Sequence, residues 1–112
     1  MIVMVSGPYS APTSEQKQAN LDAMNRVAVE VLNLGHIPMI GVNAALPVAQ
    51  MVADEMKYET IMTISLALAE FYDAVVMIGT SPGADRERAV FERSNRPVFH
   101  SLAEFKAFAN RV

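Results

Sequence analysis

Residues 74–87 read AVVMIGTSPGADRE, and this stretch decides the fold class. Its first part, residues 74–78, is a continuous apolar run rich in β-branched side chains, which predicts a buried strand that ends at Gly79. Its second part carries Pro and Gly, which predicts a loop, and then continues into a helix expected over residues 84–94. A buried strand that leads directly into a helix is the unit from which parallel α/β sheets are built.

The same alternation of strand and helix runs along the whole chain. Three further apolar runs predict strands, and four further segments predict helices. Pro38 lacks an N–H donor, so the strand that contains it is expected at the edge of the sheet. The strands are expected at 2–5, 37–42 and 97–99, and the helices from the Thr13–Ser14 cap to Gly35, from Pro47 onward, over 56–70 and over 101–110.

This order of elements predicts one α/β domain over residues 1–112. We expect a doubly wound, flavodoxin- or Rossmann-like parallel sheet of four to five strands, with strand order 2-1-3-4 and helices on both faces. In such a sheet the strand order reverses between the first and third strands. Ligands bind at that point, outside the carboxyl ends of the strands.

The composition excludes several classes of protein. Of the 112 residues, 52% are apolar and 19% are charged, which excludes a disordered chain. No apolar stretch approaches the ~20 residues that span a bilayer, and the N-terminus lacks the basic region of a signal peptide. The net charge is −3 without a basic stripe, so a nucleic acid polymer is not an expected partner. With no Cys and neither His in ligand spacing, we expect a cytoplasmic protein without metal or cofactor.

The reversal point selects the candidate binding residues. The loop after the first strand, residues 6–10, and the loop after the third strand, residues 79–83, should meet there. The second strand is expected to end near Asn43 at the same rim, as the fourth is near His100, whereas His36 falls at the opposite end. His100 is expected simply to precede a helix cap. The candidate binding residues from these positions are Ser6, Gly7, Tyr9, Ser10, Asn43, Ser81, Gly83 and Ala84.

Glu87 is the candidate catalytic residue. It lies three residues after Ala84 and four before Phe91, on the helical stripe that also carries Val90 and should face the sheet. A carboxylate that points inward above the carboxyl end of a sheet is suited to chemistry. A second interpretation stays open, because acidic residues near helix N-termini are favoured by the helix dipole and often accept hydrogen bonds from free N–H groups.

Four segments together carry a family resemblance. They are SGP at residues 6–8, Asn20 in the first helix, DAVV at residues 73–76 and SPGADRE at residues 81–87. Their order and spacing, over roughly residues 2–99, resemble the nucleoside 2-deoxyribosyltransferase-like superfamily, which includes the deoxynucleoside 5′-monophosphate N-glycosidases. The resemblance implies a doubly wound sheet, no cofactor and a nucleoside or nucleotide as the small-molecule partner.

The resemblance also implies roles for individual residues. Glu87 corresponds to the family's nucleophile, which attacks C1′ of a nucleoside or nucleotide, expels the base and forms a glycosyl ester. Water or a second base then takes the sugar. Ser81 and Gly83 would hold the 5′-phosphate or sugar hydroxyls, and Ser6, Gly7 and Tyr9 would form the other wall.

Two positions depart from the family pattern. Counting back from Asp73 to the position of the family's catalytic aspartate gives Ser65. Where the monophosphate hydrolases carry a hydroxyl after the first glycine, this chain has Pro8, and Ser10 is the residue that can take over its contact. Ser65 keeps open a second function, a non-catalytic nucleotide or sugar-phosphate binding module of the same fold.

A third function, an assembly subunit without a small ligand, is kept open by the Met-rich segment 51–70. A cavity between the loops after the first and third strands would argue against it. Under any of the three functions, the 46–70 region has more apolar residues than one face of a small sheet can cover. We therefore expect a homo-oligomer, and specifically a dimer. The contact residues are expected to be Met51, Met56, Ile61, Met62 and Leu66.

Overall fold

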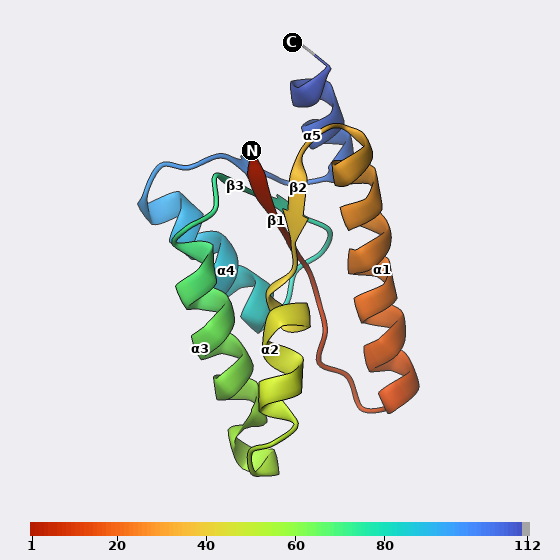
Figure 1. Ribbon diagram of the computed structural model, residues 1–112, viewed down its shortest axis with the longest axis vertical. Coiled ribbons are helices and arrows are strands. Elements are labelled where there is room, and N and C mark those ends of the chain that lie inside the picture. Colours follow the sequence, from red (N-terminus) through yellow and green to blue (C-terminus); the bar gives the residue numbers. More distant parts are fainter. Residues whose placement is uncertain (111–112) are drawn as a thin grey trace.

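The structure is a computed structural model that describes residues 1–110 and contains a four-stranded, all-parallel sheet (Figure 1). The strands are β1 (Ile2–Ser6), β2 (Ile37–Met39), β3 (Ala74–Met77) and β4 (Val98–Phe99), arranged in the order β2-β1-β3-β4. The predicted order is therefore confirmed with four strands, and β2, which contains Pro38, lies at an edge as expected. The order reverses between β1 and β3, so the loops after these two strands share one rim of the sheet.

Helices cover both faces of the sheet, as predicted. They are α1 (Ser14–Asn33), α2 (Gly41–Ala49), α3 (Lys57–Ala69), α4 (Pro82–Arg93) and α5 (Leu102–Ala109), with a short 3-10 turn η1 (Asp54–Met56) before α3. The helices α1 and α5 pack on one face, and α3 and α4 pack on the other. None of the helices within residues 1–110 is long and apolar enough to cross a membrane.

Side-chain alternation along the two central strands divides the core into two layers. On β1, Val3 and Val5 contact α1 and α5, whereas Met4 between them contacts the side of α3 and α4. On β3, Val76 belongs to the first layer and Val75 to the second. Apart from Ile2 at the start of β1, every residue of the two central strands is buried, which explains why their sequences are continuous apolar runs.

The helix ends follow the residues that predicted them. The Thr13 side chain accepts a hydrogen bond from the Gln16 N–H at the start of α1, and Gly35 follows that helix with φ +88°. At α5, the Ser101 hydroxyl caps the Glu104 N–H, and the Glu104 carboxylate accepts from the N–H of His100. His100 thus precedes a helix cap, as expected.

Two expected element boundaries are wrong. The strand predicted over residues 37–42 ends at Met39, because Ile40 caps α2 and Gly41 is already helical. The apolar run continues because Ile40 and Val42 are buried against the α1 layer, and an apolar run alone does not separate a strand from a buried helix. Pro47 does not open α2 but lies within it, where it has no backbone N–H to donate to the helix.

The residues expected at a subunit contact divide into two groups. Met51 and Met56 are exposed, at 87% and 57% of their surface. Met62 is buried within its own chain, while Ile61 and Leu66 are half-buried against the two core layers. The expectation for Met62 is therefore wrong, because this residue faces α4 rather than solvent.

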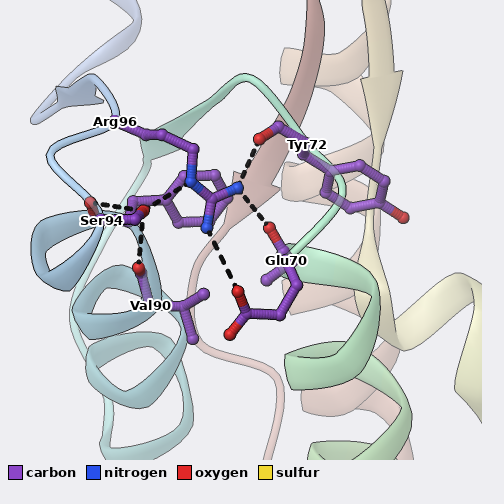
Figure 2. A network of polar contacts seen from close by, with 7 residues as sticks. Glu70, Tyr72, Val90, Ser94 and Arg96 are labelled. Atoms are coloured by element: carbon purple, nitrogen blue, oxygen red, sulfur yellow. Dashed lines mark hydrogen bonds and ion pairs between the residues drawn. The ribbon is translucent and has the colours of Figure 1, made fainter.

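Arg96, in the loop between α4 and β4, joins the ends of α3 and α4 (Figure 2). Its guanidinium donates to the carbonyl oxygen of Ala69, the last residue of α3, at 2.7 Å, and to that of Tyr72, three residues further on. It also donates to the Ser94 hydroxyl at 2.6 Å and lies 4.4 Å from the centre of the Phe91 ring. These contacts fix the relative position of the two helices that carry Ser65 and Glu87.

Candidate active site

Glu87 is held by side chains from two other elements. Its side chain lies on the predicted inward stripe of α4 with Ala84, Val90 and Phe91, and the residue is only 7% exposed. The Ser6 hydroxyl, at the end of β1, donates to Oε1 at 2.6 Å, and the Ser65 hydroxyl, in the middle of α3, donates to Oε2. Each carboxylate oxygen thus has its own donor, which fixes the orientation of the group.

The second interpretation of Glu87, as a cap for the start of α4, is wrong. The Ser81 hydroxyl performs that role by accepting a hydrogen bond from the Ala84 N–H at 3.1 Å. The hydrogen bonds that Glu87 accepts within residues 1–110 come from the two serine hydroxyls rather than from backbone N–H groups. The side chain is therefore directed away from the helix end and toward the carboxyl ends of β1 and β3.

Burial raises the pKa of the Glu87 carboxyl above its ordinary value, because the ionised form loses its hydration. The hydrogen bonds from Ser6 and Ser65 act in the opposite direction, because they stabilise the ionised form. The net effect of these influences is a raised pKa. A carboxylate in such an environment interacts strongly with positive charge that develops next to it, because little water screens the interaction.

Glu87 borders a cavity of about 460 Å³, the inner cavity, which lies at the expected rim between the loops after β1 and β3. The cavity brings together seven of the predicted site residues, and Tyr58, Ile61, Met62 and Pro82 complete its wall. A cavity of this kind argues against an assembly subunit without a small ligand. The predicted residues that line it are Gly7, Tyr9, Ser10, Ser81, Gly83, Ala84 and Glu87.

A larger cavity of about 710 Å³, the outer cavity, adjoins the inner one. The two cavities share Tyr9, Ser10, Tyr58 and Ile61 in their walls. The outer cavity is more polar and is bordered by the start of α1 and by the corner between α2 and α3. Its charged and amide side chains are Lys17, Gln18, Gln50, Asp54 and Lys57.

Four predicted site residues do not line the inner cavity. Ser6 and Ser65 are fully buried behind Glu87 and act on the carboxylate instead. Asn20 donates to the backbone carbonyl of Tyr9 at 3.0 Å, so it holds the loop after β1 in place. Asn43 lies in the first turn of α2 because β2 ends early, and its exposed amide donates to the Asn25 side chain at 2.8 Å.

Sequence reasoning missed Gly41, Tyr58 and Met62. Met62 contacts the start of α4, since a Cβ atom on Gly83 would lie 3.2 Å from its sulfur. Tyr58 reaches the same place, with its hydroxyl 3.8 Å from that position. Both side chains come from α3 at i, i+4 spacing, and this spacing, combined with Ser65 three residues further on, is the signal that could have placed them on one helix face.

Among the described residues, no group of three or more His, Cys, Asp or Glu side chains is arranged to hold a metal ion. The inner cavity is lined by one buried carboxylate, by four hydroxyls from Tyr9, Ser10, Tyr58 and Ser81, and by the start of α4. No protein-family model matches this chain, and no curated protein matches it either.

Proposed function

We propose that this protein cleaves the N-glycosidic bond of a nucleoside or nucleoside 5′-monophosphate, with Glu87 as the nucleophile. The observation that carries the proposal is the buried carboxylate at the reversal point of the sheet, held by Ser6 and Ser65 and bordering a cavity. The family resemblance of the sequence supports the same role for Glu87. The reaction is hydrolysis, or transfer when a second base replaces water.

In the first step, an oxygen of Glu87 attacks C1′ while the bond from C1′ to the base nitrogen breaks. The base leaves with the bonding electron pair and takes up a proton from solvent, and a glycosyl ester of Glu87 forms. The sugar passes through an oxocarbenium-like state, whose positive charge the adjacent carboxylate stabilises. In the second step, water or a second base attacks C1′ and releases a proton to solvent, and Glu87 leaves as the carboxylate.

The walls of the two cavities suggest how the substrate lies. The start of α4 offers the Ser81 hydroxyl and the backbone N–H of Gly83 at the positive end of a helix dipole, which suits a 5′-phosphate or sugar hydroxyls. The leaving base must point away from the attacking carboxylate. The outer cavity beyond Tyr9 and Tyr58 provides room for it, with two aromatic rings at the entrance.

The direct test is incubation of the purified protein with a panel of nucleosides and nucleoside 5′-monophosphates, with free base measured by chromatography. We expect release of base from at least one compound and a loss on the order of a thousandfold or more in Glu87→Gln. Glu92→Gln, an exposed position on the same helix, is the matched control and should retain activity. No release from any compound, or equal release by Glu87→Gln, would refute the proposal.

Ser65 favours a second candidate function, a nucleotide or sugar-phosphate binding module without turnover. A hydroxyl, rather than a second carboxyl group, contacts Glu87 from α3, whereas most glycoside hydrolases use a pair of carboxyl groups. In this case a nucleotide should raise the melting temperature without being consumed. Gly83→Val, which would press on Met62, should then weaken binding.

A further inference from the structure

Gly41, the first residue of α2, lies against the Ser65–Glu87 pair. A Cβ atom at this position would overlap the Ser65 hydroxyl and would lie 2.6 Å from Cβ of Ser65 and 3.2 Å from Oε2 of Glu87. Ordinary contact for a Cβ atom begins at 3.4 Å, so the Cβ atom of Ser65, at 2.6 Å, would have to retreat by about 0.8 Å, and the Ser65 hydroxyl, which lies closer, would have to move further. The φ angle of Gly41 is not positive, so close approach rather than backbone conformation requires glycine here.

We propose that Gly41 is a positioning residue, whose missing side chain allows Ser65 to hold the Glu87 carboxylate in the geometry from which it attacks. This inference rests on the proposed function. Ser65 and Gly41 are both buried, so neither can move into solvent to relieve the overlap. With Ser65 displaced, Oε2 loses its donor, and the bond from Ser6 to Oε1 alone leaves the carboxylate free to rotate about its last side-chain bond.

The test compares the wild type with Gly41→Ala, Ser65→Gly and the double variant. Two quantities are measured for each, the pH dependence of kcat for base release and the pKa of the Glu87 carboxyl by ¹³C NMR, with its signal assigned from Glu87→Gln. Among the residues that line the inner cavity, Glu87 carries the one carboxyl group, and Tyr9 and Tyr58 carry phenols, so the carboxyl signal to follow is that of Glu87.

For Gly41→Ala we expect about a hundredfold lower kcat with little change in KM, since the carboxylate loses one of the two hydrogen bonds that orient it, and a misplacement of about 1 Å in a catalytic group typically costs that much. The acidic limb of the kcat profile and the NMR pKa of Glu87 should both move to higher pH, because a hydrogen bond that stabilises the ionised form is lost. Ser65→Gly, which lacks the hydroxyl and Cβ, should move the pKa in the same direction. Adding Gly41→Ala to Ser65→Gly should change neither kcat nor the acid dissociation constant of Glu87 by more than about twofold, because the Ser65 atoms that would overlap are gone.

Gly35→Ala is the matched control. This glycine has φ +88° and no atom within 4 Å of its Cβ position, so the substitution strains the backbone without contact to Glu87. It should lower the melting temperature but leave the pKa of Glu87 unchanged, which separates positioning from loss of stability.

The inference is overturned if Gly41→Ala keeps the wild-type kcat and Glu87 pKa, or if its effect is equally large in the Ser65→Gly background. Should Gly41→Ala fail to fold, the double variant decides. A double variant that folds and matches Ser65→Gly supports the inference, and one that also fails to fold contradicts it, since Ser65 would not be the residue in the way. If no nucleotide is cleaved, the proposed function fails, while the NMR titration still decides whether Gly41 controls the carboxylate.

Discussion

At the scale of single residues, the unusual feature is a carboxylate that two neutral hydroxyls hold in the interior. Hydroxyl donors satisfy the oxygens of Glu87 but carry no positive charge to offset its charge. The free energy of unfolding is therefore lower when Glu87 is ionised, as the raised pKa of this residue indicates. A residue that destabilises the fold yet is supported by two buried donors is typical of a functional site rather than of core packing.

This cost predicts how stability depends on pH. Because the pKa of Glu87 is raised in the folded protein, the folded state keeps the proton up to a higher pH than the unfolded state does. The contribution of Glu87 to stability is thus fully present below the ordinary pKa of Glu, about 4.3, and is lost as pH rises through the raised value. We expect the free energy of unfolding of Glu87→Gln, relative to the wild type, to increase from about pH 4 to pH 8 in urea titrations.

The exposed Glu92 on the same helix gives the control for this measurement. Glu92→Gln should differ from the wild type by less than about 0.5 kcal/mol across the same range, since surface substitutions have small effects. A difference between Glu87→Gln and the wild type that is constant with pH would contradict the assignment of a buried, ionisable carboxyl.

The inward position of Glu87 was predictable because helical spacing alone places it on the stripe with Ala84, Val90 and Phe91. Ser65 was identified as a site position through the family resemblance, but its hydrogen bond to Glu87 was not predicted. Gly41 was not predictable at all. Its requirement arises from the approach of α2 to Ser65 and Glu87, which depends on packing between distant segments and leaves no local pattern in the sequence.

At the scale of elements, the site depends on the relative position of α3 and α4. Ser65 and Glu87 meet only if these helices keep their spacing. Arg96 joins the C-terminal ends of the two helices (Figure 2), whereas the inner cavity lies along their N-terminal halves. Near the cavity, Arg86 on α4 forms an ion pair with Glu59 on α3 at 3.1 Å. That pair is exposed and contributes little, so Arg96 is the stronger link.

We therefore expect Arg96→Ala to lower the free energy of unfolding by about 2–3 kcal/mol, because the carbonyls of Ala69 and Tyr72 lose their donor. Arg96→Lys should recover only part of this, since an ammonium group cannot serve both carbonyls and Ser94 in one plane. Urea denaturation measures both variants. The exposed Arg93 provides the comparison, and an equal loss in Arg93→Ala would show that the network has no special role.

Element boundaries were predicted best where a capping residue marks them. Thr13 and Ser101 begin helices as local side-chain chemistry requires. The helix expected from Ala84 begins two residues earlier, at Pro82, because Ser81 caps it. The segment after Met39 has no such mark, because Ile40 caps α2 without a side-chain hydrogen bond. Its apolar residues are buried in either conformation, so the choice between strand and helix depends on tertiary packing that the local sequence does not encode.

At the scale of the whole molecule, the topology was predictable because connection rules leave few choices for four parallel strands. The order 2-1-3-4 brings residues 6–10 and 79–84 to one rim, although more than sixty residues separate them in sequence. The outer cavity was not predicted, because its wall combines α1 with the corner of α2 and α3, which no strand order specifies.

We expect the dimer to form through the surface beside the outer cavity. Val48, Met51, Met56 and Tyr58 are between 41% and 87% exposed, and Tyr58 also lines both cavities. Contact through these residues would remove apolar surface from water and cover the corner between α2 and α3. Sedimentation at micromolar concentration should therefore give a dimer for the wild type and a monomer for Met51→Glu, because a buried carboxylate in an apolar contact is costly. Val29→Glu, an equally apolar exposed position on α1, should remain dimeric, and a monomeric wild type would refute the prediction.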